Sequence, residues 1–277
     1  MIFLLLAIVS SALVSVVMRL STGKVKNNIG MLCANYLTCT ITALAYAGFR
    51  LAPASEGLLN AIFLGGINGF LYLASFVVFQ YSVKKSGVVL SSVFMKLGML
   101  VPLVLSVILF GETPTLIQII GFVLAIIAII MINQDGKEKG RASILNLILL
   151  LLLGGSAEGM SKVFEEVGSS ALSAQFLFYT VASALVLCLF FMLAKHQKIG
   201  KNEAIYGVLV GVPNFFSAKF VLRALAHIPA IIVFPSFAVA TILTVSLVGV
   251  LVFKERLSRL GWSAVGIIIV TLALLNI

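Results

Sequence analysis

Phe110-Gly111-Glu112-Thr113 and Phe253-Lys254-Glu255-Arg256 are two short polar stretches, each of which ends one apolar segment and precedes the next. They lie 143 positions apart. At the same offset, Phe94 aligns with Phe237. A pattern that recurs at one constant offset indicates that the chain consists of two similar halves.

The composition predicts that both halves lie in a membrane. The chain of 277 residues is 61% hydrophobic and 10% charged, and its mean hydropathy of +1.21 leaves too little polar surface for a water-soluble domain. Segments such as 119–132 are apolar on every face, which is typical of a helix and not of an outer-membrane strand. We therefore expect an all-α integral membrane protein.

Apolar stretches of about 20 residues recur along the chain, and this length lets an α-helix cross roughly 30 Å of hydrocarbon. About ten transmembrane helices are expected, at 2–20, 29–49, 57–82, 88–109, 116–132, 144–164, 173–194, 204–225, 230–252 and 259–276.

Lysine and arginine residues gather in alternate loops, those after the first, third, fifth, seventh and ninth expected helices. Their positions are Lys24, Lys26, Lys84, Lys85, Lys137, Lys139, Arg141, Lys195, Lys198, Lys201, Lys254 and Arg256. The positive-inside rule makes these loops cytoplasmic and both termini external, as for a multi-pass protein of a bacterial plasma membrane. The net charge of +10 is then a topology signal, and no nucleic-acid partner is expected.

The most polar stretch, 134–143, is interpreted as a cytoplasmic linker between a first half, 1–133, and a second half, 144–277. Each half holds five expected helices. Because five is odd, the second half enters the membrane in the opposite sense to the first. The predicted fold is two inverted five-helix repeats.

Several short motifs, in their order and spacing, resemble the EamA-type transporters of the drug/metabolite transporter superfamily. They are Phe110-Gly111-Glu112 with Gly121 beyond it, Phe253-Lys-Glu-Arg-Leu-Ser258, and Arg223-Ala-Leu-Ala-His-Ile-Pro-Ala230. The resemblance implies a secondary carrier for amino acids, metabolites, nucleotide sugars or drugs. It also implies internal termini, whereas the charge pattern favours external ones.

Inverted repeats offer two packings of similar energy, and exchange between them opens a central site to each side in turn. Glycines such as Gly65, Gly69, Gly98 (with Pro102 beyond it), Gly207 and Gly211 are candidates for hinges or for close helix contacts. The sequence contains no nucleotide-binding, metalloprotease or nucleophile-elbow motif, so we expect neither an enzyme nor a metal or cofactor site. The three cysteines are interpreted as small apolar fillers.

Ionisable residues at membrane depth mark the candidate site, because they are costly unless they face a cavity or a partner. Lys96 is predicted to bind substrate or to pair with Glu158, with snorkelling of its side chain to the interface as the alternative. Glu158 is a candidate proton-coupling or cation-binding carboxylate, because removal from water favours its neutral form. Lys162, one helical turn further on, is the alternative partner of Glu158. Because Lys96, Lys162, Lys219 and Arg223 contribute positive charge, the cavity is expected to be basic.

Polar residues at depth complete the predicted site. Asn68 and Asn214 occupy comparable stretches of corresponding helices, close to expected kinks. The substrate-binding candidates are Lys96, Asn214, Asn68, Tyr72, Lys219 and Tyr179, and the proton-coupling candidates are Glu158 and Lys162.

The sequence favours a proton-coupled secondary exporter of a small polar metabolite, such as an amino acid or an organic anion, by alternating access. Its partners would be the substrate, protons and the lipid bilayer. Two alternatives stay open: a multidrug or lipid-linked-metabolite carrier with a larger, more aromatic site, and a membrane partner or sensor that does not transport. The oligomeric state, monomer or homodimer, is left open.

Overall fold

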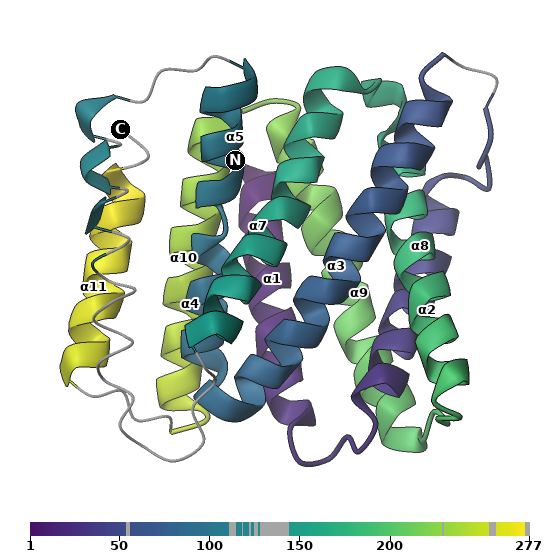
Figure 1. The fold of residues 1–277 in the computed structure, drawn as a ribbon, viewed down its shortest axis with the longest axis horizontal. Coiled ribbons are helices and arrows are strands. Elements are labelled where there is room, and N and C mark those ends of the chain that lie inside the picture. Colours follow the sequence, from purple (N-terminus) through teal and green to yellow (C-terminus); the bar gives the residue numbers. More distant parts are fainter. Residues whose placement is uncertain are drawn as a thin grey trace.

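In the computed structural model the chain is a bundle of α-helices that run between two ends of the molecule (Figure 1). The structure describes residues 1–53, 56–110, 115–117, 119–121, 123–124, 127, 144–228, 230–254 and 259–274. These residues form helices and contain no strand. The helices are α1 (Ile2–Ser21), α2 (Asn28–Tyr46), α3 (Leu58–Ser86), α4 (Val88–Leu97), α5 (Leu100–Phe110), α7 (Ile144–Val167), α8 (Ser173–Ala194), α9 (Lys201–Leu225), α10 (Ala230–Leu251) and α11 (Arg259–Leu274), with a short 3-10 turn, η1 (Ser170–Leu172), before α8.

Among the described residues, six helices are long and apolar enough to cross a membrane, namely α1, α2, α3, α7, α9 and the stretch from η1 through α8. Together with the all-helical fold, they confirm the prediction of a multi-pass membrane protein. The polar motifs around Glu112 and Glu255 and the linker 134–143 lie outside the described residues, as does most of the expected segment 116–132.

The expected helix 88–109 is wrong in one respect, because the structure divides it into α4 and α5. The break falls at Gly98 and Met99. Pro102 has no N–H, so it cannot donate to the carbonyl of Gly98 and is tolerated only in the first turn of α5. Val101 donates to the Gly98 oxygen instead, at 2.8 Å. A glycine followed closely by a proline therefore interrupts the helix in the middle of its apolar run.

Helices from the two halves pack in a reciprocal pattern. Helix α2 packs against α9 just as α8 packs against α3, and α2 and α8 also contact each other. Helix α1 packs against α10, and α7 packs against both α4 and α5. Exchanging the two halves of the chain maps each of these contacts onto another of them or onto itself.

Two pairs of glycines, spaced four residues apart, allow these helices to approach closely. Gly65 and Gly69 in α3 lie against the backbone of α8, and Gly207 and Gly211 in α9 lie against that of α2. A Cβ atom added at Gly211 would lie 2.7 Å from the carbonyl oxygen of Asn35, closer than real Cβ atoms come. Of the two roles expected for these glycines, the structure supports close packing.

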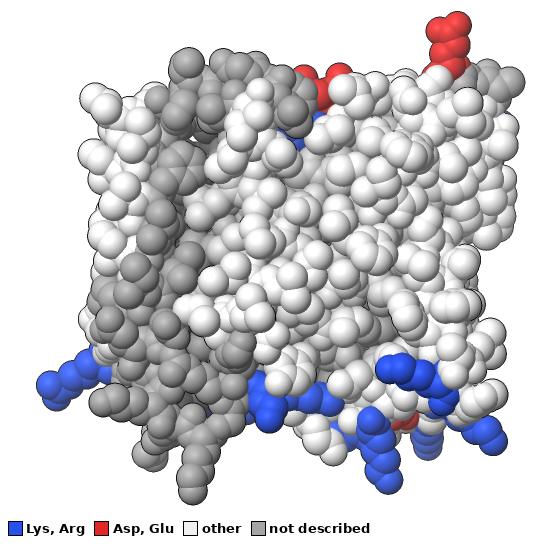
Figure 2. Space-filling model, viewed as in Figure 1, with Lys and Arg blue, Asp and Glu red and all other residues white. Residues whose placement is uncertain are grey.

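Most of the exposed lysine side chains gather at one end of the bundle (Figure 2). Arg50, after α2, and Arg223, near the end of α9, are also exposed but lie toward the opposite end. The basic end carries the loops that follow α1, α3, α8 and α10, while the N-terminus lies toward the opposite end (Figure 1). Aspartate and glutamate side chains are visible mainly at that opposite end (Figure 2). The two ends of the bundle therefore differ in charge.

The closest approach in the centre joins Gly155 of α7 to the break between α4 and α5. A Cβ atom at Gly155 would collide with the Gly98 carbonyl and lie 2.6 Å from Cγ2 of Val101. At the neighbouring Gly154, a Cβ would make ordinary contacts of 3.5 Å with Met95. Gly155 therefore fixes how closely α7 sits against the broken helix.

We predict that Gly155→Ala destabilises the purified protein by about 1–3 kcal/mol, because the added methyl group overpacks this contact. Gly154→Ala is the matched control, and it should leave stability unchanged or raise it by up to about 1 kcal/mol through better helix propensity. Thermal unfolding in detergent measures both. Equal melting temperatures for the two variants would contradict the proposed role of the Gly155 contact.

Candidate functional site

A cavity of about 70 Å³ lies at the centre of the bundle, where helices of both halves meet. Helices α1, α3 and α4 line one part of it, and α7, α9 and α10 line the rest. The polar side chains of the lining include Ser15, Tyr72, Ser92, Lys96, Glu158 and Asn214. Four of the predicted site residues, Tyr72, Lys96, Glu158 and Asn214, are thus brought to a single cavity.

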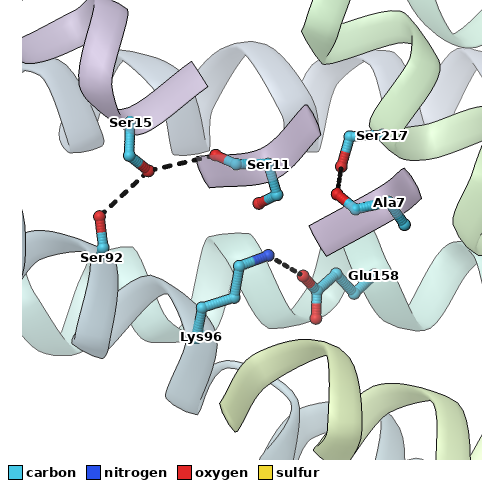
Figure 3. A network of polar contacts seen from close by, with 7 residues as sticks. All are labelled: Ala7, Ser11, Ser15, Ser92, Lys96, Glu158 and Ser217. Atoms are coloured by element: carbon cyan, nitrogen blue, oxygen red, sulfur yellow. Dashed lines mark hydrogen bonds and ion pairs between the residues drawn. The ribbon is translucent and has the colours of Figure 1, made fainter. Parts of the chain in front are cut away.

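Lys96 and Glu158 form an ion pair across this cavity, with 3.4 Å between Lys96 Nζ and Glu158 Oε1 (Figure 3). The lysine side chain is 7% exposed and the glutamate side chain 19%. The ammonium also lies 3.8 Å from the centroid of the Phe237 ring, which attracts a cation through its electron-rich face. Lys96 therefore does not snorkel to the membrane surface. Its charge is stabilised by a carboxylate and an aromatic ring.

Local structure places both charged groups. Lys96 lies in the last turn of α4, where the free carbonyls of a helix C-terminus favour a positive charge. Glu158 lies one turn beyond Gly154 on α7, on the face that packs against the broken helix. Because Gly155 has no side chain, α7 comes close enough to α4 for the carboxylate to reach the ammonium.

Serine hydroxyls form a second polar group around the pair (Figure 3). Ser92 of α4 donates to Ser15 of α1 at 3.1 Å, and Ser15 donates to the Ser11 carbonyl oxygen at 3.4 Å. On α9, Ser217 donates to the carbonyl oxygen of Ala7 at 3.5 Å. The sequence analysis did not include these serines in the site. The sequence feature that could have identified them is spacing: Ser11 and Ser15, and likewise Ser92 and Lys96, lie one helical turn apart on otherwise apolar helices.

Asn214 lies on the wall of the cavity and connects it to α2. Its side-chain amide nitrogen is 3.4 Å from Asn35 Oδ1 and 3.7 Å from Cys39 Sγ. Pro213 precedes it within α9 and removes one backbone N–H donor from the helix. The amide is thus held beside a weakened turn, as expected from its sequence context.

Four other predicted residues are not among those that line the cavity. Lys162 pairs with Glu165 at 3.1 Å and with Glu166, toward the end of α7. Asn68 is buried elsewhere in α3, and Tyr179 donates to the carbonyl oxygen of Leu51 at 3.1 Å. Lys219 lies with its ammonium 4.0 Å from the centroid of the Tyr46 ring.

These placements correct the expectation of a basic cavity. Among the described residues that line it, the charged groups are Lys96 and Glu158, which have opposite signs. The cavity is therefore close to neutral overall but strongly dipolar. It can present a positive and a negative group to one small ligand.

The model of the EamA-like transporter family matches residues 1–134 of the chain. The first half of this chain belongs to the EamA-like transporter family. That family is part of the drug/metabolite transporter superfamily, which confirms the resemblance seen in the sequence motifs. The match covers the half that supplies Lys96, Tyr72 and the serines of α1 and α4.

Similarity to known proteins extends over the whole chain. An uncharacterized protein of Haemophilus influenzae (strain ATCC 51907 / DSM 11121 / KW20 / Rd) is 28% identical over 279 residues, with 94% of this chain and 92% of that protein covered. A solved crystal structure has the same fold, with a TM-score of 0.65 and 14% identity over 99% of this chain and 94% of that one. The whole chain thus shares its fold with a solved structure and its first half matches the EamA-like transporter family, and its site has to be interpreted from its own residues.

Proposed function

We propose that this EamA-like protein is a secondary active exporter of a small zwitterionic metabolite, with an α-amino acid as the class that fits best. The observation that carries the proposal is the Lys96–Glu158 pair inside the central cavity. An amino acid brings a carboxylate for Lys96 and an ammonium for Glu158. Both buried charges then exchange one partner for another, and neither is left unpaired.

An organic anion is the less favourable ligand of the two expected from the sequence. Its carboxylate would also bind Lys96, but it would displace Glu158 without offering a cation in return. The displaced carboxylate would then have to take up a proton, because an unpaired charge at this depth is costly. The two ligand classes therefore predict opposite coupling to protons.

The size of the cavity also favours a small ligand. Drug-sized ligands occupy sites of roughly 300–1,000 Å³, whereas this cavity measures about 70 Å³. A compact ligand therefore requires the smaller expansion of the cavity. Phe76, Phe79 and Phe237 line the cavity as the multidrug alternative would require, but the volume argues against that alternative.

Alternating access is supported by the reciprocal packing of the two halves, in which α2–α9 corresponds to α8–α3. We propose that the halves are inverted repeats whose exchange opens the cavity to each side. The break between α4 and α5 lies directly beside Lys96, and discontinuous helices are a common feature of transporter sites near the bilayer midplane.

A zwitterionic substrate also predicts that transport is coupled to protons. A protonated Glu158 no longer attracts the ammonium of an amino acid, so proton and substrate exclude each other at the same site. Mutual exclusion of this kind produces antiport, and an inward proton gradient would then drive the metabolite outward. The titratable side chains that line the cavity among the described residues are Tyr72, Lys96 and Glu158.

We further propose that the basic end of the bundle faces the cytoplasm of a bacterial cell. The exposed lysines of the loops after α1, α3 and α8 share that end, as the positive-inside rule requires. The N-terminus then lies on the external side (Figure 1).

The first test is ligand binding to the purified protein by thermal stabilisation, with amino acids, organic acids and cationic drugs as probes. An amino acid should raise the melting temperature saturably. Lys96→Ala should weaken its binding by about 10–100-fold, since a charge-assisted hydrogen bond is lost. Lys219→Ala, which removes a cation outside the cavity lining, is the matched control and should leave affinity unchanged. Stabilisation by cationic drugs alone would contradict the proposal and support the multidrug alternative.

The second test measures the pH dependence of amino-acid binding and of exchange in proteoliposomes. Affinity should fall as the pH falls, because protonation of Glu158 removes the group that binds the ammonium. Glu158→Gln should bind more weakly and lose this dependence, while Glu165→Gln on the same helix should keep it. Affinity that rises as the pH falls would indicate an organic anion taken up together with a proton.

The third test concerns topology. Single cysteines at Lys198 and Glu56, which are exposed at opposite ends of the bundle, can be probed with a membrane-impermeant maleimide in intact cells. Glu56→Cys should be labelled directly and Lys198→Cys only after the membrane is permeabilised. Native cysteines are buried and should give little background. The reverse labelling would place the basic end outside and overturn the assignment.

A further inference from the structure

An apolar groove of about 430 Å³ lies on the outside of the bundle, between α2, α3, α7 and α8. Its lining is aliphatic or aromatic, apart from Cys188 and Lys195. Phe70, Val77 and Phe191 line it and are themselves 58%, 46% and 47% exposed, so the groove opens to the lipid-facing surface. It is separate from the central cavity, with which it shares no lining residue.

A second space of about 560 Å³ adjoins this groove at the basic end of the bundle. The two spaces share Ile29, Leu32 and Val77 as lining residues. The second space is additionally lined by the polar residues Lys26, Asn27, Asn28, Gln80, Tyr81, Gln197 and Lys198. From Val77 to Phe70 along α3 the apolar part extends inward by roughly 10 Å, at 1.5 Å per residue. The combined space therefore has a polar mouth and an apolar interior.

The mouth is positively charged. Lys26, Lys195 and Lys198 are exposed, and in the described part of the chain no ion pair is made by their ammonium groups. The nearby carboxylate of Glu203 is already used, because its Oε1 accepts from the backbone N–H groups of Lys26 and Asn27 at 2.9 and 3.1 Å.

The mouth also offers acceptor capacity. Gln197 Oε1 is buried and has no hydrogen-bond partner among the described residues. The mouth thus provides cations for an anion and an acceptor for a hydroxyl group.

We propose that this amphipathic groove binds an anionic glycerophospholipid from the leaflet at the basic end of the bundle. One acyl chain lies in the apolar groove, and the phosphate lies between Lys26 and Lys198, with Lys195 nearby. A hydroxyl of the headgroup donates to Gln197. A free anion would leave the apolar groove unfilled, and a neutral lipid would leave the lysines without a counter-charge.

The position of the lipid predicts what it does. The groove lies at the seam where α2 of the first half meets α8 of the second, next to the contact of 3.1 Å between the sulfur atoms of Cys33 and Cys188. A lipid bound there bridges the two halves. It should stabilise the packing of their basic ends.

The test uses the purified protein in an uncharged detergent, with thermal unfolding and native mass spectrometry as readouts. Dioctanoyl-phosphatidylglycerol should raise the melting temperature saturably and bind with a defined stoichiometry. Dioctanoyl-phosphatidylcholine tests the need for net negative charge, and glycerol 3-phosphate tests the need for an acyl chain. Neither should stabilise the protein.

Equal stabilisation by the phosphatidylcholine would indicate a lipid site without charge recognition, and stabilisation by glycerol 3-phosphate would indicate a soluble-anion site. Either result overturns the proposal.

Variants locate the site. Lys26→Gln with Lys198→Gln should weaken the affinity for phosphatidylglycerol by about 30-fold, given the usual contribution of a basic residue near an anionic headgroup. Lys85→Gln with Lys254→Gln removes the same charge from exposed positions outside the groove and should have no comparable effect. An equal loss in both double variants would overturn the proposal, because it would mean attraction to net charge alone.

The apolar part is tested separately. Ala74→Phe fills the groove and should also weaken binding, whereas Val186→Phe, on an exposed face of α8, should not. The double lysine variant alters exposed side chains only, so its fold should be intact even if Ala74→Phe proves unstable. Unchanged phosphatidylglycerol affinity in the double lysine variant would by itself refute the site.

Discussion

A positive and a negative charge inside an apolar bundle constrain the rest of this structure. Removing either partner of such a pair leaves an uncompensated charge, at a cost of about 3–5 kcal/mol in measured cases. Lys96 and Glu158 come from different halves of the chain, so this constraint couples the two halves. The bare backbone at Gly98 and Gly155 lets their helices approach closely enough for the pair to form. Close packing and charge pairing at the centre therefore depend on each other.

A carrier also needs this pair to open. The separation of 3.4 Å is longer than that of a tight charge-assisted hydrogen bond, which is about 2.7–2.9 Å. Phe237 lies on the same ammonium and remains as a partner when the carboxylate moves away. The charge of Lys96 is thus stabilised by both the Glu158 carboxylate and the Phe237 ring. In the proposed mechanism a substrate would displace the carboxylate only, and the ring would stay in contact. This arrangement lowers the cost of separating the charges while keeping the lysine in the cavity.

Sequence reasoning predicted a multi-pass helical protein and named Lys96 as one of two candidate partners for Glu158, because apolar length and buried charge are strong signals. It did not decide between Lys96 and Lys162 as the partner of Glu158. Helical spacing shows which residues are neighbours on one helix, but not which neighbour finds a better partner elsewhere. Lys162 instead pairs with Glu165 and Glu166 in the following turn, and Lys219 lies against aromatic rings. Gly98 with Pro102 was a candidate hinge, but a division into two helices was not predicted there, because glycine and proline are also common in unbroken membrane helices.

Residues that align at the offset of 143 positions can differ in chemistry between the two halves. Ser15 aligns with Glu158, and both line the same cavity. The hydroxyl of Ser15 is committed to the backbone of α1 and to Ser92, whereas the carboxylate of Glu158 faces a cation. In the proposed inverted repeat the backbone would give two packings of similar energy, whereas its side chains give the site a single polarity. Because the ammonium comes from α4 and the carboxylate from α7, the proposed zwitterion would have one favourable orientation in the cavity. Pseudo-symmetry can thus serve the conformational exchange while the asymmetry of the charges serves recognition.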